Sequence, residues 1–127
     1  MLKVLIADDE EKICQLIIKL INWEEMGLKI AATASNGIEA LEQAKICKPE
    51  ILITDIRMPG IDGMELIRKV KEKLPDTEII IISGYRHFEY AQTAIRYGVR
   101  NYLLKPIKKR GITGYLTKDR RYLQGEK

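Results

Sequence analysis

Carboxylates stand where two apolar stretches of this sequence end. Asp55 comes directly after the run ILIT, and the acidic trio Asp8, Asp9 and Glu10 comes directly after the run LKVLIA. A buried strand has no packing use for an aspartate at its end. Several carboxylates in one place raise each other's pKa unless a cation lies among them. Carboxylate oxygens are the hard ligands that Mg²⁺ takes, so these acids predict a magnesium site if the fold gathers them.

Two more polar residues follow apolar runs. Ser83 ends the run EIIIIS, and Lys105 follows the run RNYLL. A lysine ammonium can hold a phosphate as a point charge, and a serine hydroxyl can donate a hydrogen bond to it. A metal ion nearby would lower the cost of bringing a phosphate up to Asp55. An aspartate in such surroundings can attack phosphorus and form an acyl phosphate. The residues therefore predict phosphoryl chemistry at Asp55.

The apolar runs alternate with helical patterns. Apolar residues recur at helical spacing from Ile13 to Ile21, and we expect this helix to end near Gly27. Further helices are expected after Ser35-Asn36-Gly37, from Asp62-Gly63 to Pro75, and around Phe88 up to Gly98. The five strands are expected over residues 2–7, 28–34, 51–54, 78–83 and 100–104.

This alternation of strands and helices predicts an α/β fold with one doubly wound parallel sheet. Strands joined by helices pair in parallel with right-handed crossovers, and their near-continuous apolar runs suit a sheet covered on both faces. Ligands of such folds bind beyond the carboxyl ends of the strands. The acids, Ser83 and Lys105 are therefore expected at one rim of the sheet.

Composition narrows the class of protein. The chain has 127 residues, enough for one domain. No apolar run approaches the roughly 18 residues of a membrane span, and the start becomes acidic too early for a signal peptide. Cys14 and Cys47 are expected to be reduced thiols in a cytoplasmic protein. Residues 105–127 carry 8 basic and 2 acidic side chains, whereas residues 1–104 carry 14 and 16.

Four motifs stand in the order and spacing of a known family. They are DDE at 8–10, DIRMPGIDG at 55–63, SGY at 83–85 and YLLKP at 102–106. Together they resemble the receiver domains of bacterial two-component response regulators, over residues 2–107. The stretches INWEEMG and SGYRHFEYAQTAIRYGVRNYLLKPI look most like receivers joined to AraC-type DNA-binding domains. The resemblance implies a flavodoxin-like sheet with strand order 2-1-3-4-5 and helices on both faces.

The resemblance also implies roles for the residues at the rim. Asp55 would accept a phosphoryl group from the phosphohistidine of a histidine kinase. Mg²⁺ would be held by Asp9, Asp55 and the backbone carbonyl of Arg57, with Asp8 assisting through water. Lys105 would pair with the phosphate.

Switching and output are implied in the same way. Ser83 and Tyr102 would form the conformational switch, and the Lys105–Pro106 peptide would be cis. The face made by the fourth helix, the fifth strand and the last helix would bind a partner or a second copy. Such a domain is no enzyme beyond its own phosphorylation and slow dephosphorylation. It would control transcription through an effector domain that this sequence does not contain.

Three rival functions fit the residues less well. A nucleotide- or flavin-binding module would place a glycine- or hydroxyl-rich loop after the first strand, where this chain has three acids. A haloacid-dehalogenase-like phosphatase needs a second aspartate where Arg57 stands. A pseudo-receiver would lack an acidic-pocket residue or the lysine, and both are present.

The C-terminal segment departs from the family pattern. We expect a receiver core over residues 1–107 and a basic segment over residues 108–127 with a weak, frayed last helix. Gly111 and Gly114 each cost a helix about 0.8–1 kcal/mol relative to alanine. Ile112, Tyr115 and Leu116 are expected to tuck against the sheet. The segment shows no two-helix recognition unit, so no direct DNA binding by this chain is expected. Either the chain is part of a longer regulator or it acts alone.

Overall fold

Five parallel strands form one central sheet in the computed structural model, which describes residues 1–84, 88–99 and 101–125. The order in the sheet is β2-β1-β3-β4-β5 and every neighbouring pair is parallel. The doubly wound fold and the strand order expected from the sequence are confirmed. Residue 100, expected to begin the fifth strand, lies outside the described residues. The strands are β1 (Leu2–Ala7), β2 (Leu28–Ala34), β3 (Ile51–Thr54), β4 (Glu78–Ser83) and β5 (Asn101–Leu104).

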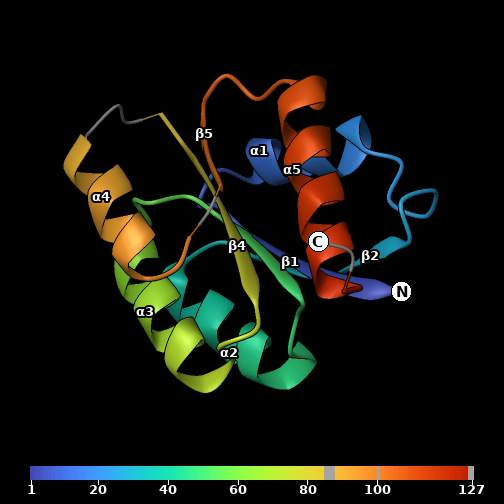
Figure 1. Cartoon of the computed structure of the whole chain (residues 1–127). Helices are drawn as coiled ribbons and strands as arrows, with labels where there is room; N and C mark the ends of the chain where they lie inside the picture. The colour runs from blue at the N-terminus through green and yellow to red at the C-terminus, as the bar shows by residue number, and fades with distance from the viewer. Residues whose placement is uncertain (85–87, 100, 126–127) are drawn as a thin grey trace.

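Helices cover both faces of this sheet (Figure 1). The helices are α1 (Glu11–Leu20), α2 (Gly37–Cys47), α3 (Gly63–Lys73), α4 (Phe88–Arg96) and α5 (Lys109–Leu123). One apolar core lies between the sheet and α2, α3 and α4, and a second lies between the sheet and α1 and α5. Because successive strand side chains point to opposite faces, β1, β3 and β4 contribute to both cores. Within the described ranges, no helix combines the length and apolar composition that a bilayer crossing requires.

The register of the strands sets where their last residues meet. Ala7 at the end of β1 pairs with Thr54 at the end of β3, and Ser83 at the end of β4 pairs with Leu104 at the end of β5. The chain also changes direction across the sheet here, since β1 lies between β2 and β3. Doubly wound sheets bind ligands at this switch point. The residues that follow these four strand ends are therefore held close together.

Side-chain caps fix the starts of α2 and α3. The side-chain Oδ1 of Asn36 accepts a hydrogen bond from the Glu39 backbone N–H at 2.8 Å, and the Asp62 carboxylate accepts one from the Glu65 N–H at 2.9 Å. Such caps satisfy donors that have no partner inside the helix. Both caps sit where the sequence predicted a helix to begin.

The end of α1 differs from the prediction. The helix stops at Leu20, because the backbone becomes extended at Ile21 (φ −112°, ψ 137°). The following turn returns the buried Trp23 to the second core, where its indole N–H donates to the Ile18 carbonyl at 3.1 Å. The expected end near Gly27 was therefore wrong: burying the indole required the chain to leave the helix. Leu16, expected on the apolar face, is 41% exposed.

The last helix packs against the sheet through the apolar residues that the sequence predicted. α5 runs over 15 residues despite Gly111 and Gly114. Ile112 and Leu116 are fully buried in the second core, and Tyr115 packs against it. Burying these side chains outweighs the helix penalty of the two glycines. The expected packing of Ile112, Tyr115 and Leu116 against the sheet is confirmed, whereas the weak hold of the last helix and the domain boundary at residue 107 stay predictions.

A pair of leucine substitutions tests this packing. We predict that Leu116→Ala lowers the free energy of unfolding by about 2–5 kcal/mol, because it leaves a cavity at a fully buried position. Leu16→Ala, the control at an exposed leucine, should change it by less than about 1 kcal/mol. Urea unfolding followed by circular dichroism measures both values. Equal losses in the two variants would contradict the packing of α5.

Candidate functional site

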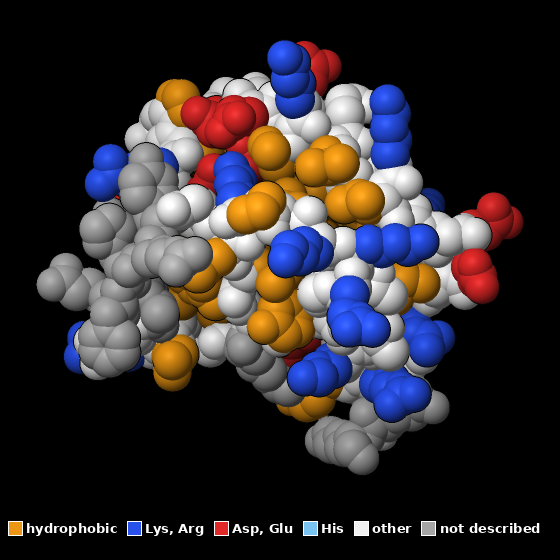
Figure 2. All heavy atoms as spheres, turned by 90° about the horizontal axis from the view of Figure 1, so that it is seen from above, with side chains coloured by type: hydrophobic (Ala, Val, Ile, Leu, Met, Phe, Trp, Pro, Cys, Tyr) orange, Lys and Arg blue, Asp and Glu red, His pale blue; other side chains and the backbone are white. Residues whose placement is uncertain are grey.

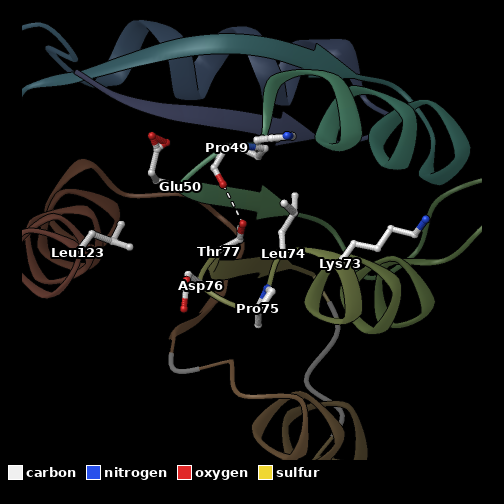
Figure 3. Close-up of a pocket in the computed structure, with 9 residues that line it drawn as sticks. Pro49, Glu50, Lys73, Leu74, Pro75, Asp76, Thr77 and Leu123 are labelled. Carbon is white, nitrogen blue, oxygen red and sulfur yellow. Dashed lines mark hydrogen bonds between the residues drawn. The ribbon is translucent and has the colours of Figure 1, made fainter.

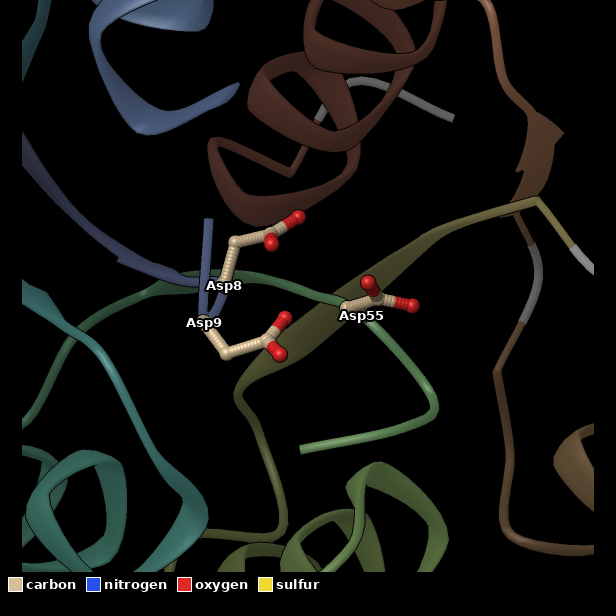
Figure 4. A group of neighbouring side chains, drawn as sticks. All are labelled: Asp8, Asp9 and Asp55. Atoms are coloured by element: carbon tan, nitrogen blue, oxygen red, sulfur yellow. The ribbon is translucent and has the colours of Figure 1, made fainter. Parts of the chain in front are cut away.

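The structure brings Asp8, Asp9, Asp55 and Lys105 together at the carboxyl edge of the sheet. One carboxylate oxygen from each aspartate lies within 4.8 Å of the other two, and all three side chains point toward a common space (Figure 4). Asp8 and Asp9 follow β1, and Asp55 follows β3. The gathering expected from the strand ends is therefore present.

Asp55 is held rigidly and is 6% exposed. Its Oδ1 accepts a hydrogen bond from the Ile56 backbone N–H at 2.7 Å, and its Oδ2 accepts one from the Lys105 ammonium at 3.0 Å. The Thr54 hydroxyl donates to the Asp55 backbone carbonyl at 2.9 Å. These contacts fix the carboxylate in one orientation, which is what a positioned nucleophile requires.

Lys105 is the cation at the centre of the acids. Its Nζ lies 3.0 Å from Asp55 Oδ2, 3.2 Å from Asp8 Oδ2 and 3.8 Å from Glu10 Oε1. Burial by itself would lower the pKa of Lys105, but the hydrogen bond to Asp55 and the charges of Asp55 and Asp8 outweigh burial and raise that pKa. The lysine therefore stays charged. The Lys105–Pro106 peptide is cis, as predicted.

The surroundings of Asp8 raise the pKa of its carboxyl group. Burial, joined by the nearby charge of Asp55, raises the pKa of Asp8 from its ordinary value of 3.8 to about 6. The hydrogen bond from the Glu10 backbone N–H at 2.9 Å and the ammonium of Lys105 work in the opposite direction and do not cancel the rise. Negative charge at Asp8 is thus incompletely balanced by the protein.

The donor set fits a hard divalent cation. Asp8, Asp9 and Asp55 lie together, and the Lys105 ammonium lies within 3.2 Å of Asp8 and Asp55, so the three carboxylates outnumber this ammonium. Asp9 is exposed, which leaves the site open to water and to a ligand. A hollow of about 290 Å³ lies here, lined by Asp9, Glu10, Asp55, Arg57, Gly84 and Lys105. Oxygen ligands plus water are the coordination that Mg²⁺ prefers.

The other predicted residues lie close by in the chain. Ser83 is fully buried at the end of β4, and its backbone carbonyl accepts a hydrogen bond from the Lys105 N–H at 2.8 Å. Tyr102 on β5 is partly buried against the first core. Arg57 is exposed and lines the hollow. The roles of these residues in binding and switching remain predictions.

One residue that supports the site was missed by sequence reasoning. Gly63, at the start of α3, lies so close to the β3 end that an added Cβ would be 2.0 Å from the Asp55 backbone carbonyl oxygen. Any side chain there would push α3 away from Asp55. The sequence placed Asp62-Gly63 at a helix start and at the end of the motif DIRMPGIDG, but it gave Gly63 no role at Asp55, because the approach of α3 to β3 depends on tertiary structure.

A second hollow lies at the opposite edge of the sheet (Figure 3). It measures about 330 Å³ and lies where the chain enters β3 and β4, with the Thr77 hydroxyl donating to the Pro49 carbonyl at 2.8 Å. Its charged lining is balanced, with Lys48 and Lys73 against Glu50 and Asp76. Among the described residues, no cluster of side chains of the same charge lines this hollow. We therefore place the functional site at the carboxyl edge of the sheet.

Comparison with known proteins identifies the family. A model of the response regulator receiver domain matches residues 4–117 of this chain. The chain belongs to the response regulator receiver domain family. The resemblance drawn from the motifs is thereby confirmed.

Relatives of this receiver domain are transcriptional regulatory proteins. The chain is 45% identical over 116 residues to the uncharacterized transcriptional regulatory protein YesN of Bacillus subtilis, covering 91% of the chain and 32% of that protein. It is 40% identical over 107 residues to the transcriptional regulatory protein HptR of Staphylococcus aureus, covering 84% of the chain and 42% of HptR. The receiver domain thus spans less than half the length of these relatives.

Solved structures of receiver domains superpose closely on the chain. The receiver domain of AraT, a response regulator from Geobacillus stearothermophilus, is 42% identical, with a TM-score of 0.93 over 98% of this chain and 97% of that one. A two-component transcriptional regulator AraC from Clostridium phytofermentans is 33% identical, with a TM-score of 0.91 over 99% and 98%. The similarity to AraC-type receivers expected from the sequence is confirmed.

The raised pKa of Asp8 predicts a pH-dependent stability in the absence of divalent metal. A carboxyl whose pKa is higher in the folded state than in the unfolded state destabilises the fold once it ionises. This penalty is absent below pH 4 and complete above pH 6. Asp8→Asn removes the charge and keeps an acceptor for Glu10. We predict that at pH 7 in EDTA the variant is more stable than the parent by about 2 kcal/mol.

Urea unfolding at several pH values measures this difference. The gain should vanish near pH 4, where Asp8 is protonated in both states. Asp76→Asn, at an exposed aspartate in the turn before β4, serves as the control and should show no comparable gain. Equal stability of the Asp8→Asn variant and the parent at pH 7 would contradict the electrostatic account.

Proposed function

We propose that this receiver domain accepts a phosphoryl group on the carboxylate of Asp55 from the phosphohistidine of a histidine kinase. A carboxylate oxygen forms the new P–O bond while the P–N bond to histidine breaks, which leaves an acyl phosphate. The observation that carries the proposal is the fixed contact of Asp55 with Lys105 at 3.0 Å beside an open hollow. An ammonium in that position can hold the phosphoryl oxygens as they arrive.

We further propose that Asp8, Asp9, Asp55 and the backbone carbonyl of Arg57 hold Mg²⁺. The metal, when bound, supplies positive charge that offsets the carboxylates and the incoming phosphate. The chain's own groups orient the reaction: the Ile56 N–H holds one oxygen of Asp55, and Lys105 lies beside the other. The excess negative charge that raises the pKa of Asp8 supports this assignment.

The proposed role is that of a switch without turnover of a separate substrate. The acyl phosphate would be lost only by slow hydrolysis. A phosphatase of the aspartyl-nucleophile type would need a second carboxylate two residues after Asp55, and Arg57 stands there. We place the phosphotransfer in the cytoplasm, which suits the two free thiols Cys14 and Cys47.

The proposed output runs through Ser83 and Tyr102 to the face formed by α4, β5 and α5. Phosphate at Asp55 would draw the Ser83 hydroxyl inward, and Tyr102 would move into the vacated space. The phosphoryl group would shift the equilibrium between the two conformations because it makes different contacts in each of them. An effector domain, as the greater length of the relatives suggests, would then control transcription. The family resemblance implies that either a partner or a second copy of the chain binds this face.

Phosphorylation is tested by intact-mass measurement after incubation with acetyl phosphate. We predict the gain of one phosphoryl group in Mg²⁺, its removal by hydroxylamine as for any acyl phosphate, and no gain in EDTA. Asp55→Asn should abolish labelling, and Lys105→Met should slow it about 100-fold, because a charge-stabilising donor is lost. Asp76→Asn is the matched aspartate control. Undiminished labelling of Asp55→Asn, or labelling without any divalent metal, would overturn the assignment.

Switching is tested with beryllofluoride, a mimic of the phosphoryl group. Backbone amide shifts should change around Asp55 and also on β5 and α5. In Ser83→Ala the changes around Asp55 should remain, while those on β5 and α5 should shrink, because the hydroxyl that couples them is missing. Thr117→Ala, which removes a hydroxyl from α5, is the control. Identical changes in Ser83→Ala and the parent would remove Ser83 from the switch.

A further inference from the structure

Another hollow, of about 340 Å³, lies between α5 and the turn that joins α1 to β2. Four residues line it from one side of α5, spaced four, four and three apart, namely Lys109, Thr113, Thr117 and Arg120. Four more line it from the turn, namely Ile21, Asn22, Glu25 and Met26. This hollow shares no lining residue with the one at the carboxyl edge, so the two are separate sites.

Two polar atoms of this lining lack a hydrogen-bond partner. The Nε of Arg120 and the Oγ1 of Thr113 are both buried, and neither makes a hydrogen bond within the described residues. No carboxylate of those residues pairs with the Arg120 guanidinium. Buried polar groups are almost always hydrogen-bonded, and a charged one left alone is costly. Because both side chains line the hollow, a rotation about their side-chain bonds can present these donors to a ligand there.

The charge around this hollow favours a negative ligand. The outer surface of α5 is basic, because the helix contains five basic residues and one acid, Asp119, which is buried and hydrogen-bonded to Asn101. Figure 2 shows Lys and Arg side chains gathered on one side of the molecule. Glu25 brings a carboxylate to the lining, but the Asn22 side chain donates a hydrogen bond to it at 2.9 Å. Arg120 therefore lacks a negative partner among the described residues.

The size and the apolar part of the lining restrict what this ligand can be. Ile21 is buried in the second core and Met26 packs against it, so both give the hollow an apolar wall on the side of the turn. Ligand pockets measure roughly 300–1,000 Å³, and this one is at the small end of that range. A guanidinium matches the two oxygens of a carboxylate. The lining therefore suits a small carboxylate that also has an apolar chain.

We propose that the hollow between α5 and the α1–β2 turn binds a small organic carboxylate with a short apolar chain. The carboxylate accepts the hydrogen bonds that Arg120 and Thr113 do not make otherwise, and Lys109 adds a second positive charge. The apolar chain lies against Ile21 and Met26. Since such a ligand contacts both α5 and the turn, it stabilises the folded chain. The proposal does not depend on phosphotransfer to Asp55, because the two sites share no residue.

Titration of the chain with sodium butyrate in EDTA, followed by backbone amide shifts, tests the proposal against sodium chloride of equal ionic strength. We expect saturable changes at residues 21–26 and 109–120 and none around Asp55. Arg120→Gln should weaken binding about tenfold, because a charge-assisted hydrogen bond is lost. Thr113→Val keeps the shape of the side chain and should weaken binding about fivefold. Arg121→Gln, the control at an exposed cation of the same helix, should bind as the parent does.

Two further probes decide which part of the ligand is recognised. Butanol, which has the same chain without the carboxylate, should cause no saturable change at these residues. Inorganic phosphate should bind more weakly than butyrate, because it has no chain to cover Ile21 and Met26. Equal affinity for phosphate would mean that charge alone is recognised, and it would overturn the proposal. So would the absence of saturable changes with butyrate, or changes that both Arg120→Gln and Thr113→Val leave as they are in the parent.

Discussion

The burial of two carboxylates beside one lysine is the constraint on which the carboxyl edge of this domain depends. Asp8 and Asp55 are 3% and 6% exposed, and the Lys105 ammonium contacts both. Removing charges from water is costly, and their mutual attraction repays that cost only with good geometry and further hydrogen bonds. The site supplies these through the backbone N–H groups of Glu10 and Ile56. Its negative charge still exceeds what Lys105 offsets, which leaves the edge suited to a cation.

The strand register and the loops that follow the strands hold Asp8, Asp55 and Lys105 in this geometry. β1 and β3 end in register, so the acids that follow them start from neighbouring positions. β5 ends beside β4, and Lys105 leaves it in hydrogen-bond contact with the Ser83 carbonyl. Gly63 allows α3 to approach the Asp55 backbone without a clash. A parallel sheet covered on both faces is rigid enough to hold such a site, because its strands are fully packed.

The same strand that delivers Lys105 to the acids also supports the basic outer surface. β5 ends at Leu104, Lys105 follows, and α5 begins four residues later at Lys109. The buried hydrogen bond of 2.9 Å between Asn101 and Asp119 ties α5 back to β5. Acidic and basic regions of the domain are therefore joined through one short strand. That connection is a physical route by which a change in charge at Asp55 can reach α5.

The sequence by itself determined the sheet, the strand ends and the acids that follow them, because apolar runs, caps and motif spacing are local features. It also predicted the cis bond at Lys105–Pro106 through the family resemblance. Tertiary structure alone decided the rest. α1 ends at Leu20 because Trp23 is buried, Gly63 matters because α3 approaches Asp55, and α5 forms despite two glycines because Ile112 and Leu116 find a core. Each outcome depends on residues distant in sequence, whose packing energy exceeds the local preferences that a sequence pattern reports.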